Sequence, residues 1–208
     1  QRQMCIRDRG AHDVLIEVHA SSVNVLDSKI RNGEFKLILP YALPLVLGND
    51  LAGVVVEVGP QVQRFKPGDE VYARPPETRI GTFAQWIAVN ENAIALKPAN
   101  TSMTEAASIP LVALTAWQVL VETAQLKKGQ KVLIHAGAGG VGTLAIQLAK
   151  HLGAFVATTT STANVEWVKA LGADQVIDYK QQNFESLLHG YDLCLLYTSP
   201  NPRDATLS

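Results

Sequence analysis

Three glycines, Gly137, Gly139 and Gly142, have the spacing G-x-G-x-x-G. The apolar run Val132–Ile134 precedes them, and from Val141 onward the apolar residues recur at helical spacing. In this strand–turn–helix context a diphosphate can approach bare backbone, and the first N–H groups of the helix attract its negative charge. The alternative is that the glycines only pack a strand against a helix. We predict a dinucleotide site formed by Gly137, Gly139, Gly140, Val141 and Gly142.

The segment that follows the next expected strand bears on the choice between NAD and NADP. A site that prefers NAD has an Asp or Glu about 20 residues past the glycines, where it holds the ribose 2′-hydroxyl. Here that segment, 155–162, is rich in Thr and Ser, and no acidic residue occurs between Glu122 and Glu166. A carboxylate would repel a 2′-phosphate, whereas hydroxyls can donate to it. We therefore predict NADPH as the cofactor, with Thr159 and Ser161 in its site.

Strands and helices alternate from residue 131 onward, and this order positions the glycine motif. The pattern predicts strands at 131–135, 154–159 and 175–178, helices at 141–151 and 164–171, and a further strand opening at Tyr191-Asp192. A βαβαβ order implies a parallel sheet with right-handed crossovers. A complete doubly wound domain needs two such halves, so we expect the chain to be a fragment of a longer protein.

The part before residue 97 is β-rich. Short β-prone runs lie at 14–20, 51–58, 70–73 and 83–89, with turn signals between them. This spacing suggests a small barrel-like domain. A capping box, Ser102 to Glu105, then predicts a helix that Pro110 breaks or kinks, and a second helix over 111–122 links the domains. We place the domains at 10–105 and 106–192.

The bulk composition is that of an ordinary soluble globular protein. The 208 residues are 47% hydrophobic and carry a net charge of −1, so charge gives no reason to expect a nucleic acid or a membrane surface as partner. The most apolar region, 37–58, is interrupted by prolines and polar residues and cannot span a bilayer. Only two cysteines, Cys5 and Cys194, are present, which excludes a disulfide framework. We expect a cytoplasmic location.

Both ends of the chain lack any periodic pattern. Residues 1–9 and 193–208 have neither helical nor strand spacing, and the latter segment contains two prolines. We expect both segments to be non-native, an N-terminal scar and a C-terminal tail, and we leave them out of the fold prediction.

Several motifs in the right order resemble the medium-chain dehydrogenase/reductase superfamily. These motifs are 47–59, 65–72, 135–142, 171–174 and 176–179. The resemblance is strongest to the zinc-free quinone oxidoreductases and the alkenal/enone reductases. It implies an α/β protein with an N-terminal GroES-like β-barrel domain and a truncated Rossmann-type, doubly wound parallel sheet. It also implies a substrate cleft between the two domains and a homodimer for the full-length protein.

The resemblance also allows a prediction about metal. Zinc-dependent alcohol dehydrogenases bind a catalytic zinc ion through Cys and His ligands. The first cysteine ligand would fall within Asn24–Asp27 and the histidine at Asn49, and neither ligand is present. The five histidines show no ligand spacing. We therefore predict no zinc.

The family implies roles for residues near the start of the chain. Asn24 would face the nicotinamide, and Lys29 could donate to a substrate carbonyl, although it is as easily a solvated surface lysine. Tyr41 could line the cleft or simply pack. Asp27 is better explained as the cap of a helix starting at Ser28 than as a proton carrier.

Further family positions lie in the second domain. Thr115 matches a residue near the nicotinamide ring, although a helical threonine can also bond to its own backbone. Tyr179 matches a tyrosine that holds the 2′-phosphate. Asn164 stands where related reductases have a lysine, which weakens the grip on the phosphate without restoring an acid.

Without zinc, the remaining chemistry is hydride transfer from NADPH to a quinone or an activated C=C bond, in which the conjugated carbonyl of the substrate takes up charge. We expect the fragment itself to be inactive. The alternative is a non-catalytic dinucleotide-binding or structural protein that retains the same fold.

Overall fold

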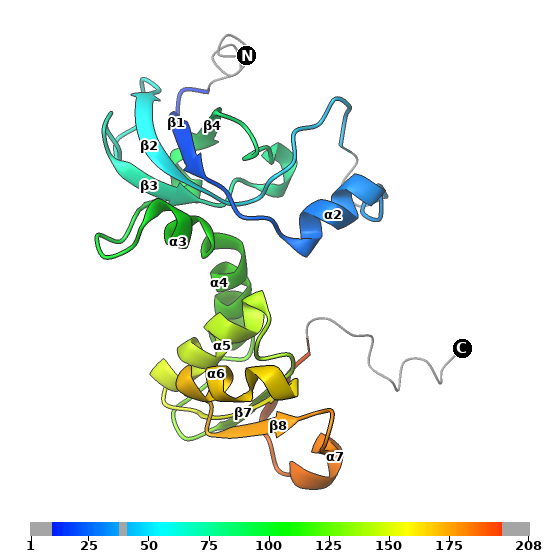
Figure 1. Cartoon of the computed structure of the whole chain (residues 1–208). Coiled ribbons are helices and arrows are strands. Elements are labelled where there is room, and N and C mark those ends of the chain that lie inside the picture. The colour runs from blue at the N-terminus through cyan, green and yellow to red at the C-terminus, as the bar shows by residue number, and fades with distance from the viewer. Residues whose placement is uncertain (1–9, 38–40, 197–208) are drawn as a thin grey trace. The chain divides into compact units, whose positions relative to one another are not determined.

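The computed structural model describes residues 10–37 and 41–196 (Figure 1). The predictions for residues 1–9 and 197–208 lie outside the described residues. The chain divides into two compact units, Gln1–Leu111 and Val112–Ser208. Within the described ranges, no helix is both long and apolar enough to cross a membrane.

The first unit is built on a five-stranded antiparallel sheet. Its strand order is β4-β1-β2-β3-β5. The strands are β1 (Asp13–Ala20), β2 (Leu51–Val58), β3 (Glu70–Ala73), β4 (Trp86–Asn90) and β5 (Ile94–Leu96). The β-prone runs predicted from sequence correspond to the first four strands, but β4 begins three residues later than the run at 83–89. Strand β5 was not predicted, because three residues are too few to show a period.

Alternating side chains of these strands form the core of the first unit. Val14, Ile16, Leu51 and Val71 are fully buried. Burial of each such side chain contributes roughly 1.5–3 kcal/mol relative to its exposure. The helix α3 (Met103–Ala107) covers the other face of the sheet near Ala52, through Ala106 and Ala107. Three small side chains permit this close helix–sheet packing.

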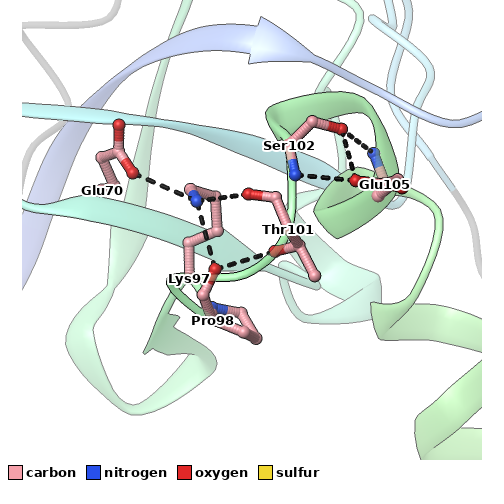
Figure 2. A network of polar contacts seen from close by, with 6 residues as sticks. All are labelled: Glu70, Lys97, Pro98, Thr101, Ser102 and Glu105. Atoms are coloured by element: carbon pink, nitrogen blue, oxygen red, sulfur yellow. Dashed lines mark hydrogen bonds and ion pairs between the residues drawn. The ribbon is translucent and has the colours of Figure 1, made fainter.

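A buried lysine anchors the segment between β5 and α3 (Figure 2). The Lys97 side chain is 6% exposed, and its Nζ donates to the Thr101 carbonyl at 2.6 Å and the Pro98 carbonyl at 3.2 Å. The same ammonium pairs with Glu70 Oε2 at 3.1 Å. Ser102 and Glu105 form the predicted capping box, since the Ser102 N–H donates to Glu105 Oε2 at 2.8 Å. Two carbonyls and a carboxylate thus compensate for the burial of the charge.

The second unit contains a four-stranded parallel sheet, as predicted. Its order is β8-β7-β6-β9, with strands β6 (Lys131–Ile134), β7 (Phe155–Thr160), β8 (Gln175–Asp178) and β9 (Leu193–Leu195). Strand β9 lies inside the segment 193–208, which we had predicted to be a non-native tail without periodic pattern. It pairs in register with β6, and Leu195 is buried. The sheet therefore extends into that segment.

Helices α5 (Gly140–His151) and α6 (Val165–Ala170) cover one face of this sheet (Figure 1). Their apolar side chains pack on the strands, and the buried cluster includes Val132, Ile134, Ala145, Ile146, Ala149, Val156 and Val168. The short helix α7 (Phe184–Leu187) follows β8 and was not predicted.

The helix α4 (Pro110–Trp117) begins at a proline, where the missing N–H removes no intrahelical bond. It continues as a π-helical segment, η3 (Gln118–Thr123), so the two together span the predicted helix at 111–122. The remaining helical elements are the α-helix α2 (Val25–Asn32) and the 3₁₀ turns η1 (Glu77–Arg79), η2 (Glu91–Ala93) and η4 (Thr162–Asn164).

Candidate functional site

Two of the motif glycines are buried and are required by the packing of the turn. A Cβ atom at Gly137 would overlap Thr158 Oγ1, on the neighbouring strand β7. A Cβ atom at Gly142 would overlap the Ala136 carbonyl oxygen and lie 2.8 Å from Gly137 Cα. For these two positions, the packing explanation raised from the sequence is sufficient.

The third motif glycine, Gly139, and the adjacent Gly140 face outward at the start of α5. Gly139 and Gly140 are exposed, and Gly139 is the N-cap of the helix. The Thr143 N–H donates to the Gly139 carbonyl at 2.9 Å and makes the first bond of the helix. The N–H groups of Gly140, Val141 and Gly142 precede that bond, and such groups at a helix start have no intrahelical acceptor. Bare backbone and the positive end of the helix dipole thus occur together, which suits a diphosphate.

A threonine on β7 holds the turn that leads into this helix. Thr159 Oγ1 accepts from the Ala136 N–H at 3.2 Å and lies 3.1 Å from His135 Nδ1. Ala136 adopts a left-handed φ of 54°, an unfavourable conformation for a non-glycine residue. Thr159, a predicted cofactor residue, is only 5% exposed. Its hydroxyl therefore serves to shape the turn.

His135 belongs to the same turn, although no spacing to another histidine or cysteine singled it out in the sequence. Its ring packs edge-on against Phe184, with centroids 4.8 Å apart. Burial lowers the pKa of His135. The imidazole is accordingly biased toward its neutral form beside the glycine turn.

The residues predicted at the 2′-phosphate lie in the loops that follow β7 and β8. Ser161 caps the turn η4, and Asn164 Nδ2 donates to Ser161 Oγ at 3.3 Å. Tyr179 is 57% exposed, and its N–H donates to the Thr160 carbonyl at 3.1 Å. The neighbouring Thr162 hydroxyl donates to the Asp178 carboxylate at 2.6 Å. Parallel strands end at the same edge of a sheet, so these loops lie next to one another.

In the first unit, the helix near Asn24 starts earlier than predicted. We expected Asp27 to cap a helix from Ser28, but α2 begins at Val25 with Asn24 as N-cap. Asp27 lies three residues after the cap and accepts the Asn24 backbone N–H at 2.8 Å. The capping role of the carboxylate is as expected, and the error is one of register. A carboxylate at this third position can reach back to the N-cap, so the same residue type caps from inside the helix.

The Asn24 side chain is held by a fully buried carboxylate. Asn24 Nδ2 donates to Asp50 Oδ2 at 2.8 Å, and Ser22 Oγ donates to the same oxygen at 2.7 Å. The other oxygen, Asp50 Oδ1, accepts the Leu111 N–H at 2.7 Å. Burial raises the pKa of Asp50, and the hydrogen bonds from Ser22, Asn24 and Leu111 oppose that rise. The two valines that flank Asn24 are 79% and 74% exposed, so this segment presents apolar surface beside a fixed carboxamide.

Asn49, at the position expected for a histidine ligand, is turned toward Asp27. Its Nδ2 donates to Asp27 Oδ1 at 2.8 Å, and the Gly48 N–H donates to the same oxygen at 3.1 Å. Asn49 Oδ1 is buried without a hydrogen-bond partner among the described residues. Across residues 10–37 and 41–196, no cluster of three or more His, Cys, Asp or Glu side chains could hold a metal ion. An amide donor and an already bonded carboxylate do not fit zinc.

The remaining predicted residues are held less firmly. Lys29 is exposed, and its Nζ lies 3.9 Å from Glu34 Oε2. The Tyr41 hydroxyl donates to the Glu77 carbonyl at 2.8 Å, and burial raises the pKa of this phenol. Thr115 is half-buried on α4.

A hollow of about 670 Å³ opens on the first unit. It is lined by the end of β1, by Val46 and by the segment that leads into β4, namely Val18, His19, Ala20, Ser21, Val46, Thr82, Phe83, Ala84, Gln85 and Trp86. Ser21 Oγ lies 2.7 Å from Thr82 Oγ1 and donates to the Asp50 carbonyl at 2.6 Å, so this wall adjoins the carboxylate that holds Asn24. Neither Lys29 nor Tyr41 is among the lining residues. The sequence did not indicate this hollow, because its wall combines segments far apart in the chain.

Comparison with known protein families gives two matches. Residues 10–99 match the alcohol dehydrogenase GroES-like domain, and residues 140–195 match the zinc-binding dehydrogenase family. The second match extends to Leu195, the last residue of β9.

Several characterised proteins are similar over most of the chain. A 2-methylene-furan-3-one reductase of Solanum lycopersicum is 44% identical over 201 residues, which cover 93% of this chain and 51% of that protein. A chloroplastic NADPH-dependent alkenal/one oxidoreductase of Arabidopsis thaliana is 46% identical over 188 residues, covering 86% and 48%. The quinone oxidoreductase structure from Coxiella burnetii gives a TM-score of 0.86 at 38% identity, covering 93% of this chain and 62% of that one. The chain thus spans about half the length of the curated relatives it matches.

Proposed function

Because the chain belongs to the medium-chain dehydrogenase/reductase superfamily, in its quinone and alkenal/enone oxidoreductase branch, we propose a function for the full-length protein. It transfers hydride from NADPH to a quinone or an α,β-unsaturated carbonyl compound, without zinc. This proposal covers the whole protein, of which the chain supplies the GroES-like domain and the first part of the Rossmann-type domain.

One observation carries the proposal, namely the exposed pair Gly139 and Gly140 at the start of α5. Packing of the turn accounts for Gly137 and Gly142. At Gly139 an added Cβ would meet only the Ala136 carbonyl oxygen, at 3.2 Å, a tight contact that a small shift of the turn would relieve. A diphosphate would approach the backbone here. Ser161, in the turn after β7, and the exposed Tyr179 after β8 support the phosphorylated dinucleotide.

The described residues would mainly bind and orient the reactants. When bound, NADPH supplies the hydride, which adds with its electron pair to the electron-poor carbon while the conjugated oxygen takes up charge and then a proton. Asn24, held by Asp50, would fix the position of the reacting ring system. Lys29 could donate a hydrogen bond to the developing negative charge, because its ammonium is exposed and only loosely paired with Glu34. Orientation of this kind is a large part of what a protein contributes to such reactions.

The donor set supports a mechanism without zinc. Asn49 offers an N–H to Asp27, and that carboxylate already accepts from the backbone of Asn24 and Gly48. Replacement of these hydrogen bonds by zinc coordination would require Asn49 to turn and Asp27 to leave the helix start that it caps. In the proposed reaction, the conjugation of the substrate itself stabilises the charge.

The test is an assay of the full-length protein with NADPH against enones, alkenals and quinones, with a saturated ketone as control. We expect turnover of the conjugated substrates only, and no stoichiometric zinc by elemental analysis. Turnover of the saturated ketone together with bound zinc would contradict the proposal. Tight NADPH binding with no turnover on any substrate would instead support the non-catalytic alternative.

Assembly and location follow the same proposal. We infer a homodimer for the full-length protein, to be checked by its mass in solution. The cytoplasmic location predicted from composition stays a prediction, to be tested by fractionation of the source cells.

A further inference from the structure

A buried carboxylate lies at the end of β8, within the loops predicted to receive the 2′-phosphate. Asp178 is 8% exposed. Its Oδ2 accepts from the Thr162 hydroxyl at 2.6 Å and from Gln181 Nε2 at 2.8 Å, and its Oδ1 accepts the Lys180 N–H at 3.0 Å. The carboxylate thus joins the loop after β7 to the loop after β8.

The sequence pattern alone did not single out Asp178. No acid occurs between Glu122 and Glu166, and this absence favoured NADPH. In the sheet, however, Asp178 is the register partner of Thr160, the last residue of β7. Neighbouring strands lie about 4.8 Å apart, so the acid stands beside the end of β7 although it is 18 positions further along the chain.

The carboxylate is close to both residues predicted to hold the phosphate. Thr162, which donates to it, directly follows Ser161, and consecutive Cα atoms are about 3.8 Å apart. Tyr179 directly follows Asp178 and bonds through its N–H to the Thr160 carbonyl at 3.1 Å. A phosphate bound between Ser161 and Tyr179 would therefore lie within several ångströms of a second anionic group.

The carboxylate is ionised at neutral pH. The hydrogen bond from Thr162, followed by those from Lys180 and Gln181, lowers the pKa of Asp178, and the nearby Lys180 ammonium acts in the same direction. Lys180 is exposed, so solvent screens its compensating charge more strongly than it screens the buried acid. A net repulsion toward a phosphate remains.

We propose that Asp178 is a specificity-determining residue, which limits the preference of the site for NADPH over NADH. This inference rests on the proposed function, since it requires a nicotinamide dinucleotide in the site. A dianionic 2′-phosphate meets the repulsion of the carboxylate, whereas a 2′-hydroxyl carries no charge and does not. The protein should accordingly use both cofactors, with the preference for NADPH smaller than Ser161 and Tyr179 alone would produce.

The test is equilibrium binding of NADPH and NADH to the full-length protein and to the variant Asp178→Asn, at one fixed low salt concentration. We expect the NADPH Kd of the variant to fall about three- to tenfold, as for one screened charge at close range, and the NADH Kd to change by less than about twofold. Asp178→Ser also removes the charge and keeps an acceptor for Thr162. It is measured as a second variant, so that the proposal is still tested if Asp178→Asn does not fold.

Thr162→Val is the matched control, because it removes the hydroxyl that bonds to the carboxylate and leaves the charge in place. Its ratio of NADPH to NADH affinity should not rise. An equal rise in Thr162→Val and Asp178→Asn would assign the effect to loop geometry and overturn the proposal, as would equal weakening of both cofactors in Asp178→Asn. If the unaltered protein binds neither cofactor, it is the proposed function that fails, and that outcome is distinct from an unchanged affinity ratio.

Discussion

The carboxamide nitrogen of Asn24 donates to Asp50 Oδ2 at 2.8 Å, and Asp50 is fully buried. This contact fixes which way the amide faces, because the carboxylate can only accept from it. An asparagine in place of Asp50 would have one N–H₂ group where the carboxylate has an oxygen. That donor would face other donors, either Asn24 Nδ2 and Ser22 Oγ or the Leu111 N–H.

Asp50→Asn is therefore expected to lower the free energy of unfolding by about 1–3 kcal/mol through unsatisfied buried groups. It should also lower kcat while the Kd for NADPH remains unchanged, because Asn24 loses its fixed orientation. Ser22→Ala, which removes one donor to the same oxygen and keeps the Asn24 bond, should reduce kcat much less. Equal losses of kcat in the two variants would argue against a role for the Asn24–Asp50 contact.

The glycines of the turn should separate into two kinds under substitution by alanine. Gly142→Ala places a Cβ atom against the Ala136 carbonyl, so we expect a loss of about 1–3 kcal/mol in stability together with loss of nucleotide binding. Gly139 has a φ of −80°, which alanine adopts readily, and its Cβ would meet only the Ala136 carbonyl oxygen at 3.2 Å, so Gly139→Ala should lower the melting temperature less than Gly142→Ala. Its methyl group should nevertheless weaken NADPH binding by about tenfold or more, through the lost approach of the diphosphate. Calorimetric titration and thermal melting would show this, and unchanged binding in Gly139→Ala would contradict a diphosphate site there.

Stability should fall as the pH is lowered through the titration of His135. Burial lowers the pKa of this imidazole, so the unfolded chain takes up the proton more readily than the folded one. The contribution of neutral His135 is complete above the unfolded pKa of about 6.5 and is lost as the pH falls through the folded value. Between pH 8 and pH 5.5 the melting temperature of His135→Asn should accordingly drop less than that of the unaltered protein. The control is His151→Asn, at an exposed site on the same unit, and an equal loss of pH dependence in the two variants would argue against His135 as its source.

Replacement of Lys97 by methionine should destabilise the first unit. The stem of the side chain would remain packed, but the Thr101 carbonyl would lose its donor and Glu70 its partner, while the Pro98 carbonyl would keep its bond from the Thr101 hydroxyl at 2.9 Å. We expect a loss of about 1–3 kcal/mol in the free energy of unfolding by urea. The control is Lys169→Met, which removes an exposed ion pair with Glu166 and should cost less than about 1 kcal/mol. Comparable losses in the two variants would show that the buried contacts of Lys97 contribute no more to the free energy of unfolding than an exposed ion pair does.

The periodic part of the fold was predictable from sequence, and the short elements were not. Strand β6 and helix α5 follow directly from an apolar run and a change of period around the glycines, and the parallel sheet follows from the alternation of strands and helices. Strand β5 and helix α7 have three and four residues, fewer than one period needs to become visible. The start of α2 was misplaced, because an Asp can serve a helix start either as its cap or from its third position.

The candidate site shows the same division between local and long-range information. The glycine turn is a local motif, and its residues were predicted correctly as a strand–turn–helix unit. Asp50 and Asp178 were not predicted as site residues, because their role depends on partners that are distant in sequence or on another strand. Asp50 binds Asn24, 26 positions away, and Leu111, 61 positions away. A single sequence does not indicate which distant residues a buried acid will contact in the fold.

The division of the glycine turn into a buried and an exposed pair has an evolutionary consequence. Any descendant that keeps this strand, turn and helix must keep Gly137 and Gly142, whether or not it still carries a nucleotide, since the polypeptide cannot close the turn otherwise. At Gly139 and Gly140 the obligation is weaker, because an added Cβ would meet one atom at 3.2 Å in each case, the Ala136 carbonyl oxygen and Val112 Cγ1. A small shift of that neighbour would let a descendant without the cofactor acquire side chains there. Substitutions at Gly139 and Gly140 alone would therefore be the first sequence change that distinguishes a relative without the cofactor from one that still binds it.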